Sequence, residues 1–198
     1  MLGDGWKCSR VIVLAGGGNS GAGGVCAARH LANRGVSVQV VSIRRSSEAD
    51  GALGQQLLAL AEAPAEVIRW DEAFDTSGVE LVIDAVIGTG LQEAPRARQM
   101  ALVLAAQAAS GPVLSLDVPS GVNADSGETP GFAVQPARTL TLGLPKQGLT
   151  RENAGELWLA DLGIPPGVFA RAGVSFSPLF GRETRLRLRY PGEGDAAE

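Results

Sequence analysis

The chain has 198 residues, a length that fits one α/β domain with a single core. Hydrophobic residues (45%) and charged residues (19%) are in the range of globular domains, which excludes an intrinsically disordered chain. The formal net charge is −4 and the basic residues are scattered, so the basic stripe of a nucleic-acid-binding protein is missing. No apolar run reaches the roughly 20 residues of a membrane span, and residues 1–6 lack the features of a signal peptide. We expect a cytoplasmic protein without nucleic-acid or membrane partners.

Apolar segments typical of strands alternate with Ala- and Leu-rich segments typical of helices along most of the chain. Strands are expected at 11–15, 36–43, 66–70, 81–87 and 113–118, and helices at 25–33, 53–63 and 97–109. Two later strands, 138–142 and 156–160, have no full helix between them. This alternation predicts a Rossmann-like three-layer α/β sandwich, with a mostly parallel central sheet and helices on both faces.

The chain is expected to form a single domain whose core covers about 11–170. The segment from about 190 to 198 is rich in Gly, Asp and Ala, and we expect it to be frayed. Cys8 and Cys26 match neither a disulfide framework nor a zinc spacing. His30 lies one helical turn after Cys26, but such a pair is more often packed than catalytic. We interpret all three side chains as structural or incidental.

A glycine-rich segment, GGGNSGAGG at 16–24, follows the first strand. The spacing Gly16, Gly18, Gly21 allows a backbone to approach a pyrophosphate at a helix N-terminus, but a glycine-rich stretch matches this pattern easily by chance.

The acidic residue that would bind a ribose about 20 residues later is absent, because the second strand leads to Ser42, Arg44 and Arg45. This disfavours NAD binding as in a dehydrogenase. The two arginines would suit a 2′-phosphate, although solvated surface arginines are the commoner explanation for such a pair.

Two aspartates end the neighbouring strands. Asp84 precedes the turn 87–90, and Asp117 precedes the tight turn 119–121. Carboxylates on adjacent strand ends can form an acid/base pair or a cation site. The alternatives are that Asp84 caps the following loop, or that the two carboxylates are close by chance. Lys146 follows a further strand, where it either points its ammonium at an anionic ligand or is simply exposed.

Taken together, these loops resemble the NAD(P)H-hydrate epimerase family, the YjeF N-terminal domain, over about 11–169. The matching segments are AARHL at 27–31, VIDAVIGTG at 82–90, DVPSG at 117–121 and the segment 161–166. The resemblance implies a Rossmann-like homodimer that interconverts the R and S epimers of hydrated NADH or NADPH at C6 of the ring.

The resemblance also implies roles for particular residues. Asp117 corresponds to the substrate-contacting aspartate and is the expected catalytic acid/base residue. Ser20, Asp84 and Ser120 correspond to the ligands of a potassium ion, which oxygen donors suit. The expected substrate-binding residues are Asn19, Ser20, Gly21, Ala22, Gly23, Gly88, Thr89, Gly90, Leu91, Gln92, Glu93, Ala94, Asp117 and Lys146.

The sequence departs from the family in two places. The family usually reads Asn-Asn-Gly-Gly-Asp where this chain has 19–23, so Gly23 stands in place of an aspartate and a weaker hold on substrate is expected. Family members also carry a helical segment before the first strand, and only about ten residues precede Val11. These departures leave two alternatives open, a weakened epimerase and a nucleotide-binding module without turnover. A dehydrogenase is disfavoured because a catalytic dyad and the ribose carboxylate are missing.

Overall fold

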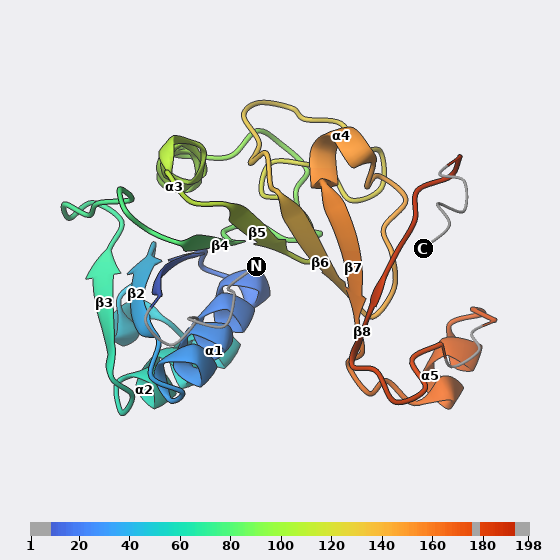
Figure 1. Ribbon diagram of the computed structural model, residues 1–198, viewed down its shortest axis with the longest axis horizontal. Helices are drawn as coiled ribbons and strands as arrows, with labels where there is room; N and C mark the ends of the chain where they lie inside the picture. The colour runs from blue at the N-terminus through green and yellow to red at the C-terminus, as the bar shows by residue number, and fades with distance from the viewer. Residues whose placement is uncertain (1–8, 176–178, 193–198) are drawn as a thin grey trace.

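The computed structural model describes residues 9–175 and 179–192. Within these ranges eight strands form one sheet, in the order β3-β2-β1-β4-β5-β6-β7-β8 (Figure 1). All neighbouring strands from β3 to β7 are parallel, and β8 is antiparallel to β7. The strands are β1 (Arg10–Ala15), β2 (Ser37–Ser42), β3 (Ala65–Arg69), β4 (Leu81–Ala85), β5 (Val113–Leu116), β6 (Arg138–Leu142), β7 (Glu156–Ala160) and β8 (Arg185–Arg187). The helices are α1 (Asn19–Ala32), α2 (Gly51–Leu60), α3 (Ala97–Ala108), α4 (Arg151–Ala154) and α5 (Pro166–Arg171), with a short 3-10 helix at Ser46–Glu48.

The central strand β1 shows why the sheet is covered on both faces. Successive side chains of a strand point to opposite faces, and every residue from 11 to 15 is buried. Val11 and Val13 pack into a cluster with residues of α1 and α2, whereas Ile12 and Leu14 pack with residues of α3. Figure 1 shows α1 and α2 below the sheet and α3 above it. The predicted three-layer sandwich is therefore confirmed.

The order of the strands reverses between β1 and β4. From β1 the chain runs outward through β2 to β3, and then returns to pair β4 with the other side of β1 before it runs outward again through β5 and β6. In doubly wound sheets such a reversal opens a crevice at the carboxyl ends of the two central strands. The loops after β1, β4 and β5 meet at this edge.

Helix α1 begins at Asn19, so the prediction that it begins at Val25 is wrong. Two thirds of the glycine-rich segment, residues 19–24, belong to the helix rather than to a loop. Glycine lowers intrinsic helix propensity, but here it allows close packing. A Cβ at Gly21 would overlap the carbonyl oxygen of Gly16, and a Cβ at Gly24 would lie 2.5 Å from Cβ of Ala85. The packing of α1 against the turn after β1 and against β4 therefore outweighs the low helix propensity of glycine.

Strand β4 ends at Ala85 and β5 at Leu116, each earlier than predicted. The backbone N–H of Val86 donates to Oδ1 of Asp84 (3.3 Å), and that of Ile87 donates to Oγ of Ser120 (2.8 Å). Because side chains satisfy these two backbone groups, the hydrogen-bond ladder of β4 ends at Ala85 and the chain leaves the sheet. The other predicted elements differ from the observed ones by small shifts at their ends.

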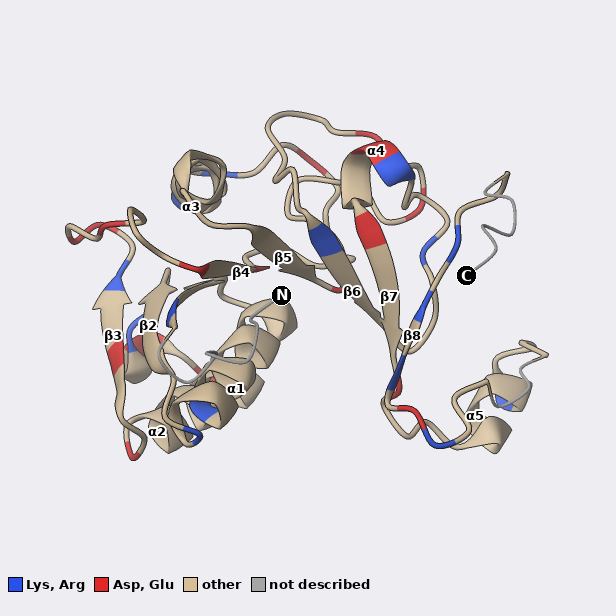
Figure 2. Cartoon of the chain, viewed as in Figure 1, with Lys and Arg blue, Asp and Glu red and all other residues tan. Residues whose placement is uncertain are grey.

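The C-terminal part adds elements that the sequence did not predict. Between β6 and β7 lies the four-residue helix α4, in agreement with the expected absence of a full helix. Arg138 and Glu156 form an ion pair across these two strands (2.7 Å). Figure 2 shows a basic band on β6 beside an acidic band on β7. Helix α5 and β8 follow, and Leu188 and Tyr190 then pack against a third apolar cluster. The packed chain thus extends beyond residue 170 to Tyr190, and the rest of the expected frayed tail, 193–198, lies outside the described residues.

Candidate functional site

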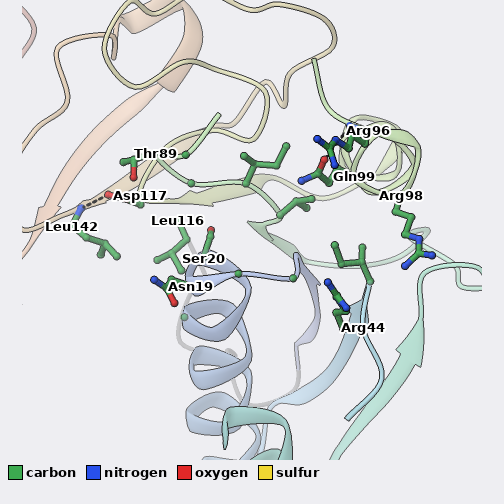
Figure 3. A pocket seen from close by; sticks show the side chains of 18 of the residues that line it. Asn19, Ser20, Arg44, Thr89, Arg96, Arg98, Gln99, Leu116, Asp117 and Leu142 are labelled. Atoms are coloured by element: carbon green, nitrogen blue, oxygen red, sulfur yellow. Dashed lines mark hydrogen bonds between the residues drawn. The ribbon is translucent and has the colours of Figure 1, made fainter. Parts of the chain in front are cut away.

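A cavity of about 880 Å³ opens at the carboxyl edge of the sheet, where the strand order reverses (Figure 3). Its walls come from the start of α1, the ends of β2 and β5, the loop after β4 and the first turn of α3. The lining residues are Gly17, Gly18, Asn19, Ser20, Gly23, Ile43, Arg44, Val86, Ile87, Gly88, Thr89, Gly90, Arg96, Ala97, Arg98, Gln99, Leu116, Asp117 and Leu142. The position agrees with the crevice expected of a doubly wound sheet.

Two helices point their N-termini at this cavity. The first turn of α1 and the first turn of α3 both line it, and neither turn contains an acidic residue. In the described part of the chain, the backbone N–H groups of Gly17, Gly18 and Asn19 donate to no acceptor. Free N–H groups and the positive ends of two helix dipoles favour an anionic ligand.

Asp117 stands at one end of the cavity in an unusual backbone conformation. Its φ is +71°, which is uncommon for a residue with a side chain, and its N–H donates to the carbonyl oxygen of Leu140 (2.8 Å). The N–H of Leu142 donates to Oδ1 of Asp117 (3.0 Å), and the Nζ of Lys146 donates to the same oxygen. The recorded hydrogen bonds of this carboxylate within the described residues all involve Oδ1, so Oδ2 remains for a ligand. Backbone strain of this kind is typical of functional sites.

Lys146 lies behind Asp117 rather than on the cavity wall. Its ammonium donates to Oδ1 of Asp117, to the carbonyl oxygen of Leu142 (2.8 Å) and to Oγ1 of Thr141 (3.2 Å). An ammonium has three donors, and here each has a partner. Lys146 therefore orients the aspartate instead of lining the cavity.

Asp84 lies below the cavity floor and is completely buried. Its Oδ2 accepts from Oγ of Ser115 (2.8 Å) and N–H of Ser120 (2.9 Å), and its Oδ1 accepts from Oγ of Ser120 (2.5 Å) and N–H of Val86 (3.3 Å). Burial raises the pKa of the Asp84 carboxyl, while the hydrogen bonds from Ser120 and Ser115 act in the opposite direction. No cationic side chain of the described residues pairs with this carboxylate.

Ser20, on the first turn of α1, is a second unusual polar group. Its Oγ is buried and has no hydrogen-bond partner in the described chain. A Cβ at Gly88 would lie 3.7 Å from this oxygen, so Ser20 faces the loop that follows Asp84. A buried hydroxyl without a partner is rare in proteins, so the Oγ of Ser20 is available to a ligand.

The cavity brings together about half of the residues predicted for the site. Those on its wall are Asn19, Ser20, Gly23, Gly88, Thr89, Gly90 and Asp117. Besides Lys146, Asp84 and Ser120, the predicted residues off its wall fall into two groups. Gly21 and Ala22 are buried on the packed side of α1, and Leu91, Gln92, Glu93 and Ala94 line a smaller neighbouring pocket. Gly23 packs closely against Leu116 at the wall, because a Cβ there would lie only 2.9 Å from Cδ2 of Leu116.

Sequence reasoning missed the basic and polar residues at the other end of the cavity. Arg96, Arg98 and Gln99 come from the first turn of α3, and their position at the N-terminus of a helix that follows the β4 loop was the available signal. Arg44 was noticed but interpreted as a surface residue, although it follows a strand that ends at the ligand-binding edge.

The other residues considered for chemistry lie elsewhere. Cys26 is half-buried on α1 and accepts from Nη2 of Arg29 (3.7 Å), and His30 is exposed beside Arg34. Among the described residues no three His, Cys, Asp or Glu side chains gather as a metal site. In the same part of the chain, no helix has the length and apolar character needed to cross a membrane.

The fold and the cavity define a doubly wound α/β domain with an anion-suited site at its strand-order reversal. The family model for the YjeF-related protein N-terminus matches residues 6–148, so the chain belongs to this family.

Relatives and a solved structure agree with this assignment. The chain is 46% identical over 174 residues to the NAD(P)H-hydrate epimerase of Dehalogenimonas lykanthroporepellens, covering 88% of this chain and 70% of that protein. It is 40% identical to the bifunctional NAD(P)H-hydrate repair enzyme of Hyperthermus butylicus, covering 80% of this chain but only 31% of that longer protein. The crystal structure of the yeast protein ynu0 superposes with a TM-score of 0.76 at 25% identity, covering 94% of this chain and 80% of that one.

Proposed function

We propose that this chain is an NAD(P)H-hydrate epimerase that interconverts the R and S forms of hydrated NADH and NADPH. The observation that carries the proposal is Asp117, held with positive φ at the cavity with one carboxylate oxygen unused. The family, and relatives named as NAD(P)H-hydrate epimerase, support the substrate. The two helix N-termini suit its phosphates. These features favour turnover over a binding module.

Asp117 is the proposed acid/base residue. Loss of the C6 hydroxyl as water requires a proton on that oxygen, and the return of water requires a base that takes the proton back. Oδ2 of Asp117 exchanges this proton, while Lys146 and the Leu142 N–H hold Oδ1 and so fix the direction of the carboxylate. The half-buried Leu116 and Leu142 line the cavity beside it and limit access of bulk water to the ring.

The change of Asp117 to Asn tests this role. The amide keeps the size of the side chain but exchanges no proton, so the enzymatic rate is expected to fall by at least about 10²-fold toward the spontaneous rate. The assay mixes chirally resolved hydrated NADPH with the protein and follows both epimers by chromatography. Asp50→Asn, at an exposed aspartate before α2, is the control and keeps full activity. Epimerisation by Asp117→Asn at the wild-type rate would rule out the proposed role.

A potassium ion is the second part of the proposal. Ser20, Asp84 and Ser120 supply oxygen atoms only, which are the donors that hard cations prefer. The buried Oγ of Ser20 without a partner and the buried Asp84 carboxylate without a cationic partner fit such an ion. Bound there, a cation supplies positive charge under the cavity and orders the loop after β4.

Removal of potassium tests this part. Exchange of potassium for the bulkier tetramethylammonium ion is expected to slow epimerisation, and Ser20→Ala is expected to weaken the response to added potassium. Both are measured as rate against potassium concentration, with Ser126→Ala at an exposed serine as the control. Equal rates in both salts, at equal ionic strength, would remove the ion from the proposal. We also propose that the protein is a homodimer, and sedimentation velocity tests this oligomeric state.

A further inference from the structure

We infer that Arg44 binds the 2′-phosphate of the substrate, so that this enzyme prefers hydrated NADPH to hydrated NADH. The inference rests on the proposed function for the identity of the ligand. It assigns the basic end of the cavity, defined here as Arg44, Arg96 and Arg98, which the proposed chemistry at Asp117 does not use.

The cavity has two chemically different ends. Figure 3 shows Asp117 at one end, with Thr89 and Leu142 near it, and Arg44, Arg96 and Arg98 grouped at the other. Of the described residues that line the cavity, Asp117 is the one with an acidic side chain. A ligand that places its reacting ring at Asp117 therefore directs the remainder of its length toward the three guanidinium groups.

The three arginines have no acidic partner of their own. Within the described residues none of them forms an ion pair, although Arg98 lies over the ring of Trp70 at 5.9 Å from its centroid. Arg96 is the N-cap residue of α3 and Arg98 lies in its first turn, which has no acidic residue to offset their charge. Three positive charges without counter-ions beside a helix N-terminus make this end of the cavity a site for phosphate.

Arg44 occupies the position that distinguishes the two cofactors. It follows β2, and in doubly wound sheets the end of this strand is where an acidic side chain binds a ribose 2′-hydroxyl or an arginine binds a 2′-phosphate. Its side chain lies across the glycine turn, because a Cβ at Gly17 would be 3.4 Å from Nε of Arg44. The guanidinium is thus next to the free N–H groups at the start of α1.

Arg45 provides a matched comparison within the same loop. It is exposed like Arg44, but it does not line the cavity, and its backbone N–H lies 3.5 Å from Oε2 of Glu48. Two adjacent arginines with equal charge therefore differ in whether they face the ligand. Their substitution separates a specific contact from a general change in net charge.

The experiment measures binding rather than turnover. Calorimetry with NADP⁺ and NAD⁺ as probes gives the ratio of their dissociation constants for the wild type, Arg44→Gln and Arg45→Gln. The wild type is expected to bind NADP⁺ at least about tenfold more tightly, as a charge-assisted contact to a phosphate predicts. Arg44→Gln is expected to bring the ratio close to one by weakening NADP⁺ alone, whereas Arg45→Gln keeps the preference.

Each outcome decides one question. Equal affinity of the wild type for the two probes, or an unchanged ratio in Arg44→Gln with a native circular dichroism spectrum, would overturn the inference and leave the epimerase proposal intact. A preference for NADP⁺ that depends on Arg44, in a protein that epimerises neither hydrate, would support the inference and refute the proposed function.

Discussion

Lys146 pairs with Asp117 and lies off the wall of the main cavity. All three of its donors are used by Asp117, Thr141 and Leu142, so its ammonium holds Oδ1 of Asp117 and leaves Oδ2 without a hydrogen bond within the described residues. The backbone of Asp117 is also fixed, with positive φ. Orientation of a reacting group to within a fraction of an ångström has a large effect on rate.

We therefore predict that Lys146→Met lowers kcat about 10²-fold and changes KM by less than about threefold. The thioether fills similar volume but leaves Oδ1 of Asp117 with the Leu142 N–H and a weak contact from Thr141. Steady-state kinetics with hydrated NADPH separates the two constants. Lys146→Arg, which retains charge, recovers part of kcat. A rise in KM at constant kcat would instead show that Lys146 binds substrate directly.

At this scale the sequence located Asp84 and Asp117 at strand ends, because an apolar run followed by a polar residue is a local pattern. It left open whether Lys146 faces an anion or solvent, and the structure shows it bound to Asp117. That contact depends on the backbone conformation of Asp117 and on a partner 29 residues away, which no local pattern encodes.

Among the elements, helix α1 both packs closely against β4 and presents its N-terminus to the cavity. Its glycines bring the helix close to the first turn and to β4, and this proximity places Asn19 and Ser20 at the cavity. The strongest constraint is at Gly21, where a Cβ would overlap the backbone of Gly16. Backbone atoms move less readily than the end of a side chain.

We predict that Gly21→Ala lowers the free energy of unfolding by about 3 kcal/mol, even though alanine is the better helix former. Urea denaturation measures the change. The control is Gly18→Ala, just before the same helix, where no atom lies within 4 Å of an added Cβ. It is expected to cost at most about 1 kcal/mol, from the weaker cap. Equal stability of Gly21→Ala and the wild type would show that the helix can shift without cost.

The same contrast explains which elements were predictable. The buried parallel strand β1 has a continuous apolar run, and β4 has an apolar run interrupted by Asp84, so their positions follow from the sequence. The start of α1 was missed because glycine weakens the helical signal. Strand β8 was missed because it has three residues, Arg-Leu-Arg, whose pairing with β7 is decided by the path of the chain.

For the whole molecule, the reversal of strand order brings the site together from distant parts of the chain. Residues from the starts of α1 and α3 and from the ends of β2 and β5 meet at one edge because β1 pairs with both β2 and β4. The alternation of strands and helices predicted such an edge. The sequence did not reveal that two helix N-termini would line the same cavity there, since that depends on which face each crossover helix covers.

The last described segment is held against the body of the fold by Tyr190. Tyr190 packs against the third apolar cluster, and its hydroxyl donates to the carbonyl oxygen of Gly155 (2.8 Å), in the turn before β7. Burial raises the pKa of the Tyr190 phenol above 10.0. It is the single tyrosine of the sequence, so its titration can be followed by absorbance without interference from another phenol.

We predict that Tyr190→Phe lowers the free energy of unfolding by about 1 kcal/mol at neutral pH, through loss of the hydrogen bond to Gly155. A folded-state pKa above that of the unfolded chain means that the protonated phenol stabilises the fold. This contribution is complete below about pH 10 and is lost as the pH rises through the folded-state pKa. Urea denaturation at pH 8 and at about pH 11 should therefore show the difference between wild type and Tyr190→Phe shrinking at the higher pH. A titration midpoint of the native protein equal to that in concentrated urea would show instead that the C-terminal segment is not held against the core.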